Sequence, residues 1–211
     1  MSMLPKAMQD LAEKLKYFPG VGTRSSQKLA LDVMQMDSDK YNELIIAFDQ
    51  ARNQVSFCKQ CGFFAQRDSL CEVCCDTSRH KSQICLVEKP TDVINMEKSQ
   101  IYRGYYHVLE ALISPLDGVF AEHTKIGELF ESRLGKVVSQ TSSEVELILF
   151  FKSGFAGEAT TAYIRQLIKE RGLVDNIKIS RLAQGLPMYY NPDTLDQATM
   201  ARALEDRRAI A

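Results

Sequence analysis

The first third of the chain carries apolar residues at helical spacing. The pattern predicts an amphipathic helix over residues 5–18, a second helix over about 24–36 and a third that begins after Ser38. Thr23 or Ser25 is expected to cap the second helix, because a side-chain hydroxyl accepts hydrogen bonds from first-turn amides. The side chains expected to face a shared helical core are Leu29, Val33, Leu44, Ile45 and Phe48.

Beyond residue 79, short apolar runs alternate with helical patterns. Strands are expected over 84–87, 105–109, 145–151 and 177–182, and helices from Pro90, over 124–134 and over 157–171. Strands that alternate with helices predict crossover connections and a largely parallel sheet. The C-terminal residues predict an extended arm followed by a short helix. The acids in the N-terminal helix argue against a secretory signal, and no apolar run approaches the roughly 20 residues of a membrane span.

The segment between these two regions has no periodicity and is rich in cysteine. Cys58 and Cys61 form one CxxC turn, and Cys71 and Cys74 form a second. Tetrahedral Zn²⁺ needs four soft ligands, and two CxxC turns each direct two thiolates toward one point. The pattern therefore predicts a closed, structural zinc site. Two alternatives are disulfides, which do not suit a reducing cytoplasm, and a redox pair, which would not need the second CxxC.

Residues around the cysteines bear on this site. Gly62 is expected to make the tight turn that lets backbone amides approach the sulfurs. Four thiolates around Zn²⁺ leave a net charge of about −2, which Lys59 and Arg67 are expected to moderate. Cys75 and Cys85 lie outside the pattern, and Cys85, within a predicted buried strand, is expected to pack in the core.

A proline-glycine turn joins the first two predicted helices. Gly20 and Gly22 allow a tight hairpin whose amides, with the N-terminus of the next helix, suit a phosphate oxygen. Arg24 and Lys28 lie four residues apart and share one helix face. The pattern predicts a helix-hairpin-helix that binds a nucleic-acid backbone without reading its sequence. The alternative is a plain helix connection, since many such turns contain glycine.

The charge of the chain is unevenly distributed. A net charge of −1 alone argues against a dedicated nucleic-acid binder. However, residues 14–31 contain bases and no acid, whereas acids outnumber bases over residues 86–158. One end of the chain suits a polyanion, although two ordinary solvated faces would give the same count.

Three acids follow predicted parallel strands. Glu88 and Asp92 come after the first of them, and Glu158 opens the helix after the strand over 145–151. Because ligands of α/β sheets bind at the C-terminal ends of the strands, these acids could converge there and hold Mg²⁺. The alternative is that they cap or pair locally.

The order of these motifs resembles the bacterial recombination-repair family RecR over essentially the whole chain. The motifs are PGVGTRS, the paired CxxC turns, VEKPTDV, ISPLDGV, GEATTAYI and RLAQGLP followed by DQATMARAL. The resemblance implies a multidomain α/β protein. Its expected parts are a helix-hairpin-helix domain over 1–55, a four-cysteine zinc finger over 56–78, a parallel α/β Toprim domain over 79–177, and a C-terminal strand and arm with a Walker-B-like segment over 178–211.

The resemblance also implies a function. The family implies a cytoplasmic, non-catalytic DNA clamp, built as a homo-tetramer or dimer, that acts with RecO and RecF to load RecA on gapped or single-stranded DNA. It places zinc on the four cysteines, DNA on Arg24 and Lys28, and Toprim acids at Glu88, Asp92 and Glu158. The alternative is a Toprim primase or nuclease, which would need a full acidic cluster for metal-assisted chemistry.

Some positions depart from the family pattern. Ala156 stands where the family usually has an acid, and Lys152 lies nearby, so Mg²⁺ binding is expected to be weak and the acids are expected to serve partner docking instead. Tyr189 and Tyr190 replace a usual pair of glycines and are expected to pack or stack. Asp196 lies in a Walker-B-like position, but the sequence has no GxxxxGK[ST] loop, so ATP hydrolysis is not expected.

Overall fold

The computed structural model describes residues 4–140, 144–152, 154–182 and 196–205. The chain divides into two compact units, Met1–Val55 and Ser56–Ala211. The boundaries expected between the finger, the α/β domain and the C-terminal arm stay predictions. No helix in the described part of the chain is long and apolar enough to cross a membrane.

The first unit contains α1 (Lys6–Leu15), α2 (Thr23–Gln35) and α3 (Ser38–Gln54), in agreement with the expected helices. The first two helices pack against each other. Their buried residues are all small, namely Ala12, Ser26 and Ala30. Small side chains let the two helix backbones approach closely, and Ser26 is satisfied by donating its hydroxyl to the Thr23 carbonyl, 2.9 Å away.

Two expectations for this unit are wrong. The N-cap of α2 is Gly22 rather than Thr23 or Ser25. Leu29 is 41% exposed, because the buried seam of α2 runs through smaller residues. The described residues of α3 include none that is buried. Its expected core residues are exposed, at 38% for Leu44, 44% for Ile45 and 54% for Phe48.

The second unit begins with a small cysteine-rich lobe. Strands β1 (Val55–Phe57) and β2 (Phe64–Gln66) form a two-stranded sheet, and a short helix, α4 (Glu72–Cys75), follows. Phe57 and Phe64 stack across the two strands with ring centroids 5.7 Å apart. This lobe leads directly into the first strand of the large sheet.

The large sheet has four parallel strands in the order β4-β3-β5-β6. The strands are β3 (His80–Val87), β4 (Gly104–Val108), β5 (Val145–Phe150) and β6 (Ile177–Arg181). Val87 at the end of β3 pairs with Val108 on one side and with Phe150 on the other, so these strand ends are level. The predicted parallel α/β architecture is confirmed.

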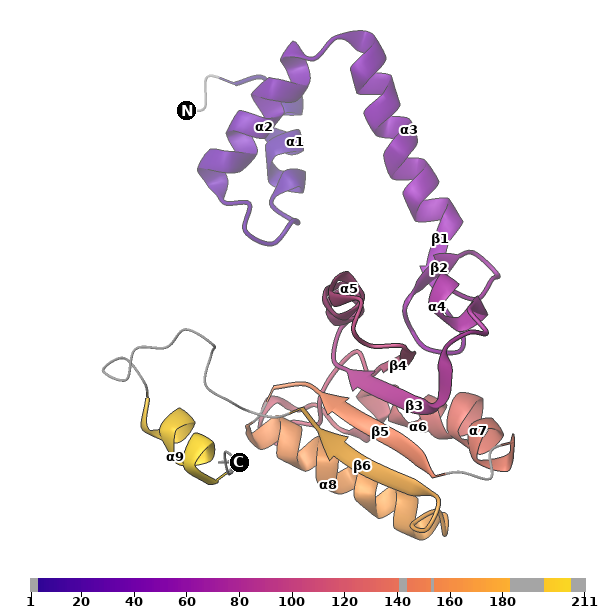
Figure 1. Ribbon diagram of the computed structural model, residues 1–211. Helices are drawn as coiled ribbons and strands as arrows, with labels where there is room; N and C mark the ends of the chain where they lie inside the picture. Colours follow the sequence, from indigo (N-terminus) through magenta and orange to yellow (C-terminus); the bar gives the residue numbers. More distant parts are fainter. Residues whose placement is uncertain (1–3, 141–143, 153, 183–195, 206–211) are drawn as a thin grey trace. The chain divides into compact units, whose positions relative to one another are not determined.

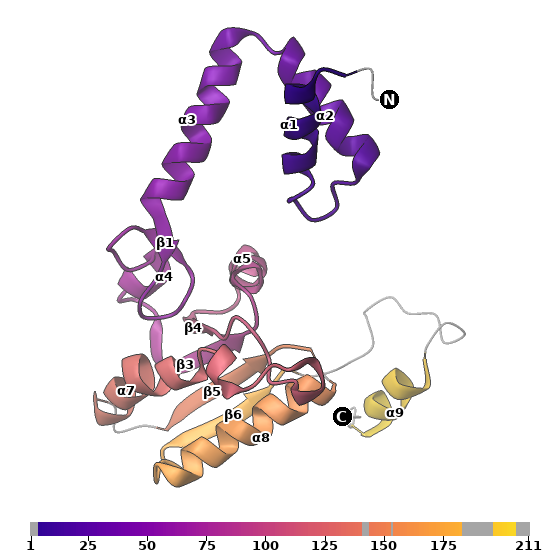
Figure 2. The same cartoon turned by 180° about the vertical axis from the view of Figure 1, so that it is seen from behind.

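Helices cover both faces of this sheet (Figures 1 and 2). One face carries α5 (Pro90–Ser99). The other carries α6 (Ile126–Glu128), a π-helical segment (Leu129–Leu134), α7 (Gly135–Gln140) and α8 (Phe155–Glu170). Short 3₁₀ turns lie at Pro115–Asp117 and Ala121–His123, and a last helix, α9, spans Gln197–Glu205.

Strand β3 shows why both faces must be covered. Ile84 and Leu86 belong to the apolar cluster under α8 and the π-helical segment. Cys85 and Val87 alternate with them and belong to the cluster on the other face, beside α5 and the cysteine-rich lobe. All four side chains are fully buried, so the expected core position of Cys85 is confirmed. Successive strand residues point to opposite faces, and a two-sided apolar strand needs cover on each side.

The strand order also marks a place for a ligand. From β3 the chain crosses to β4 on one side, and from β5 it crosses to β6 on the other. The neighbouring C-terminal ends of β3 and β5 therefore lie at the switch point of the sheet, where α/β proteins bind ligands.

Candidate metal centre and nucleic-acid interface

The four paired cysteines converge as the spacing predicts. The ligand atoms of Cys58, Cys61, Cys71 and Cys74 all lie within 4.8 Å of one another, and the Sγ atoms of Cys61 and Cys71 are 3.4 Å apart. Four sulfurs at about 2.3 Å from a tetrahedral Zn²⁺ would lie about 3.8 Å from one another. All six cysteines are free thiols. The cluster therefore fits a tetrahedral metal ion rather than disulfides.

A glycine turn shapes the first half of this cluster. Gly62 has a φ of 75°, and its amide donates to the Cys58 carbonyl at 2.8 Å. The next amide, of Phe63, donates to Cys61 Sγ at 3.5 Å. The Cys71 amide donates to Cys58 Sγ, also at 3.5 Å. The expected role of Gly62 is confirmed for the adjacent amide, because its left-handed backbone makes the turn after which the Phe63 amide reaches Cys61 Sγ.

The cluster is attached to the sheet as well as to its own lobe. The Val108 amide, at the end of β4, donates to the Cys61 carbonyl at 2.8 Å. A Cβ at Gly62 would lie 3.2 Å from the Cβ and the carbonyl oxygen of Val108, which leaves little room for any other residue. Next to this contact, His107 is buried, and its Nε2 lies 2.8 Å from the Lys125 carbonyl oxygen. Burial lowers the pKa of His107 to about 4.

The counter-charge of the cluster comes from an unexpected residue. Lys59 is highly exposed and lies 4.0 Å from Asp68, and Arg67 is also exposed. Instead, Arg133 on the π-helical segment places its Nη2 atom 2.8 Å from Cys74 Sγ. Arg133 is 59 residues from Cys74 in the chain. Local spacing carries no information on such a contact.

The turn between α1 and α2 has the form expected of a helix-hairpin-helix. Gly20 has a φ of 85°, which favours glycine, and the Val21 amide closes the turn on the Phe18 carbonyl at 3.0 Å. Gly22 occupies the N-cap of α2 and has no side chain to accept from the first-turn amides. A Cβ at Gly20 or at Gly22 would meet nothing within 4 Å. The surface beside these amides is therefore open to a ligand.

The two bases that follow the turn are accessible. Arg24 and Lys28 are both exposed on α2, four residues apart and so on one helix face. The N-terminus of a helix attracts anions through its free amides and its dipole. The hairpin and the two bases together offer one surface with donors and positive charge.

The three acids do not gather into a metal site. Glu88 and Asp92 line a cleft of about 540 Å³ at the switch point, together with the bases Lys89, Lys152 and Arg181. Across the described ranges, the cysteine cluster is the only group of three or more side chains placed to share a metal. Glu88 and Lys152 also line the adjoining hollow, where Ala156 lies.

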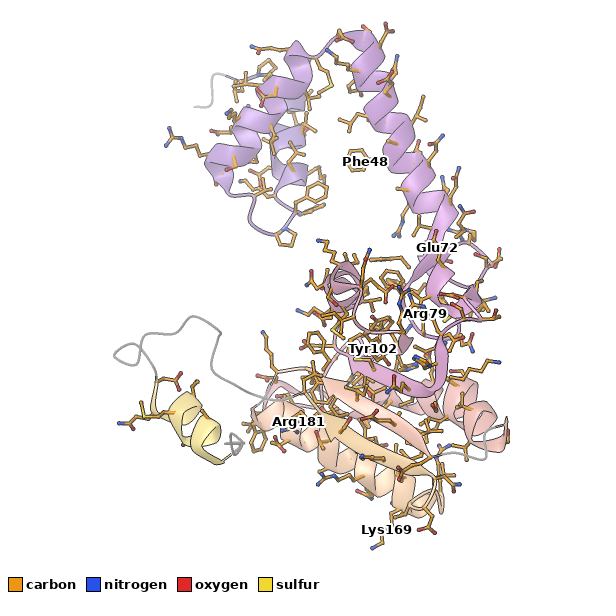
Figure 3. All side chains as sticks on the ribbon, in the orientation of Figure 1. Phe48, Glu72, Arg79, Tyr102, Lys169 and Arg181 are labelled. Atoms are coloured by element: carbon orange, nitrogen blue, oxygen red, sulfur yellow. The ribbon has the colours of Figure 1, made fainter. Side chains whose placement is uncertain are left out.

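Local pairing engages all three acids, least closely Glu88, whose Oε1 lies 4.0 Å from Lys89 Nζ. The Asp92 Oδ2 atom accepts from the Lys89 amide at 2.8 Å and so caps α5. Glu158 Oε1 accepts from Arg181 Nη1 at 2.6 Å. Arg181 is the last residue of β6 and lies near the N-terminal end of α8, whereas Lys169 lies at the other end of that helix (Figure 3). The alternative of local capping and pairing therefore holds for the three acids, most closely for Asp92 and Glu158. Tyr189 and Tyr190 lie outside the described residues.

The fold and the site define a class of protein: a Toprim-type α/β protein with a four-cysteine metal centre and a helical-hairpin unit. A Toprim domain model matches residues 82–183, and a RecR helix-hairpin-helix model matches residues 8–52. The chain belongs to the RecR family of recombination proteins.

Curated relatives support this assignment along the full length. The chain is 39% identical to Recombination protein RecR of Streptomyces coelicolor over 208 residues, which cover 99% of each chain. It is 39% identical to the protein of the same name from a Cyanothece species over 200 residues, or 95% of this chain and 94% of the relative. The Tropheryma whipplei protein is 36% identical over 99% of this chain and 100% of its own.

Proposed function

We propose that this chain is a non-catalytic DNA clamp and adaptor in recombinational repair. The observation that carries the proposal is the hairpin of the first unit. There, a glycine N-cap leaves the first-turn amides of α2 available beside the exposed Arg24 and Lys28. Amides and bases of this kind hold phosphate oxygens, which carry no sequence information. The ligand is therefore DNA of any sequence, held by its backbone.

The metal in this proposal is Zn²⁺ with a structural role. Four thiolates suit Zn²⁺, and a site with four protein ligands leaves no open position for a substrate. When bound, the ion holds together the two halves of the cysteine lobe. Gly62 and the amides of Phe63 and Cys71 orient the sulfurs, and the Val108 amide fixes the lobe to β4.

Self-association forms the clamp, as a homo-tetramer or a dimer. The support is the apolar surface of α3, where Leu44, Ile45, Ile46 and Phe48 are all exposed. A helix whose apolar side chains stay in water within its own chain loses the burial that normally stabilises helices. A second copy of the chain would provide that burial.

Partner binding involves the acids near the switch point. The family's candidate partners are RecO and RecF. Together they would load RecA on gapped or single-stranded DNA in the cytoplasm. Asp92 and Glu158 already have local partners. Glu88 has a longer local ion pair, with its Oε1 4.0 Å from Lys89 Nζ, and it lines both the cleft and the adjoining hollow. It is therefore the carboxylate on which docking of a basic surface depends most.

The Toprim fold by itself would also suit an enzyme, but the cleft argues against one. Phosphoryl chemistry at such a site relies on clustered carboxylates that hold metal ions. In this chain Lys152 and Arg181 line the same cleft as Glu88 and Asp92, and Ala156 contributes no ligand. Mg²⁺ has at most a weak site here.

The test is DNA binding by the double variant Arg24→Ala, Lys28→Ala. Its affinity should fall by a similar factor on unrelated sequences, and the slope of log affinity against log salt should decrease by roughly one unit per lost contact. The matched control removes two exposed bases of the second unit, Lys98→Ala and Lys169→Ala, and should bind like the parent. An unchanged affinity and salt slope in the first variant would leave the hairpin as a helix connection only.

A further inference from the structure

Arg133 is a buried cation whose surroundings differ from those of the other bases near the metal centre. It is only 2% exposed. Its guanidinium carbon lies 4.4 Å from the centroid of the Tyr105 ring, and its Nη2 donates to Cys74 Sγ at 2.8 Å. The guanidinium is thus held between an aromatic ring on β4 and a cysteine sulfur.

A second contact ties the same segment to the cysteine lobe. The hydroxyl of Ser132, the preceding residue, lies 3.4 Å from the carbonyl oxygen of Gln60. Gln60 belongs to the first CxxC turn, whereas Cys74 belongs to the second. Neighbouring residues of the π-helical segment therefore contact both CxxC turns. The contact between Arg133 and Cys74 is therefore part of a larger interface between the π-helical segment and the cysteine lobe.

The charge of Arg133 needs an anion. A buried charge is costly unless it is paired, and an arginine does not escape the cost by losing its proton. In the part of the chain that the structure describes, no carboxylate forms an ion pair with Arg133. Four thiolates on a divalent ion carry a net charge of about −2. The loaded metal centre is the anion that this guanidinium faces.

We propose that Arg133 is an outer-sphere ligand of the metal centre, one that retains the ion and makes the folding of the α/β sheet depend on it. This rests on the proposed zinc site. The N–H···S bond disperses negative charge from the Cys74 sulfur, so that the sulfur is less readily displaced from the metal. Conversely, loss of the metal removes the charged centre that the buried guanidinium faces.

The consequence differs from that of an ordinary finger. Groups that support metal ligands from outside typically contribute 10- to 100-fold in metal affinity. Here the supporting group lies on the π-helical segment, whose buried residues Phe130 and Leu134 belong to the core of the sheet. Metal loss should therefore destabilise the sheet domain as well as the cysteine lobe.

The test compares zinc release from purified holoprotein to a colorimetric chelator. Arg133→Met removes the charge and keeps an apolar stem, and it should release zinc about 10- to 100-fold faster than the parent. The control variant Lys59→Met removes an exposed base of the lobe that pairs with Asp68 and should release zinc at the parental rate. Arg133→Lys keeps the charge without the planar fork and should fall between the two.

A second readout covers the case in which Arg133→Met fails to fold. In Co²⁺-substituted protein, the sulfur-to-metal charge-transfer band should shift in Arg133→Lys and stay in place in Lys59→Met. Parental release rates and an unshifted band in the Arg133 variants would overturn the proposal. Absence of zinc from the parent protein would instead overturn the zinc assignment itself, so the two failures are distinguishable.

Discussion

Arg181 and Glu158 form an ion pair at the C-terminal edge of the sheet, with Nη1 2.6 Å from Oε1. A second donor of the same guanidinium, Nη2, lies 3.1 Å from the Thr161 hydroxyl. Arg181 thus comes from β6 and is held by two residues of α8. A carboxylate that is already paired with an arginine must give up part of that pairing to bind a metal ion, so its net contribution to metal affinity is smaller. This pair is a structural reason, beyond Ala156 and Lys152, to expect weak Mg²⁺ binding.

Changing Ala156→Glu should raise Mg²⁺ affinity. The new carboxylate would enter the hollow that Glu88 and Lys152 already line, and Mg²⁺ gains most from clustered carboxylates. Isothermal calorimetry on the parent, on Ala156→Glu and on the uncharged control Ala156→Gln measures the effect. Strong Mg²⁺ binding by the parent that Glu88→Gln abolishes would show that the acids form a metal site after all.

Charge reversal at Glu88 should weaken binding of the basic partner while DNA affinity and zinc content stay at parental values. Glu88→Lys would turn a cleft of mixed charge into a positive one, and like charges across an interface disfavour association. Surface plasmon resonance with purified RecO gives the measurement. Glu170→Lys, the same change at the far end of α8, is the control. Equal partner affinity in both variants would remove Glu88 from the interface.

Replacing Cys61 with serine should abolish stoichiometric zinc. The Cys61 Sγ lies within the cluster, 3.4 Å from that of Cys71. Metal binding and folding of such a lobe are linked. Elemental analysis of purified protein should find one zinc per parent chain and almost none in Cys61→Ser. Cys75→Ser alters an exposed thiol outside the cluster and should keep the metal. A parent protein with reduced cysteines and no zinc contradicts the prediction.

His107 should make the protein less stable as pH falls. Burial lowers the pKa of this imidazole to about 4, whereas an unfolded histidine titrates near 6.5. The unfolded chain therefore binds the proton first, and the stability contributed by neutral His107 is lost as pH decreases from about 6.5 toward 4. Between pH 7.5 and 5.5 the loss from this group is roughly 1.4 kcal/mol.

Urea unfolding of holoprotein at several pH values tests this. His107→Gln can still donate to the Lys125 carbonyl but does not titrate, so its stability should change less over the same range. His80→Gln alters an exposed histidine and should follow the parent. Identical pH dependence in all three proteins would show that His107 titrates normally.

Phe48→Asp should shift the protein toward smaller assemblies. Phe48 projects from α3 (Figure 3) and is 54% exposed, and a charge placed in an apolar interface is costly to bury. Size-exclusion chromatography with light scattering should show a lower mass than for the parent. Leu116→Asp, at a residue that is 84% exposed in the second unit, serves as control. If the two variants have the same mass as the parent, α3 does not hold the copies together.

The sequence predicted best where the determinants are local. Cys58, Cys61, Cys71 and Cys74 lie within one short segment, and the two CxxC turns leave few ways to place their sulfurs. Short apolar runs such as Ile84–Val87 alternate with helical patterns along the chain, and this order likewise predicted a largely parallel sheet. Ala156 and Lys152 could be identified as departures because they stand within a recognisable motif.

The remainder depended on distant contacts. Arg133 reaches Cys74 across 59 residues, and Arg181 reaches Glu158 across 23. Neither arginine belongs to a local pattern that would assign it a partner. The error in α3 has a different cause. Helical periodicity identified Phe48 as part of an apolar face, but an apolar face does not specify whether the same chain covers it.

The boundary between the two units falls between Val55 and Ser56, so the cysteine cluster lies wholly in the unit that contains the sheet. Its ties to that unit include the Val108 amide, the Ser132 hydroxyl and the Arg133 guanidinium, none of which involves the hairpin. Evolution can therefore alter or exchange the hairpin without dismantling the metal centre. Changes in the hairpin should track the kind of nucleic acid that is held, whereas the cysteines and Arg133 should change only together.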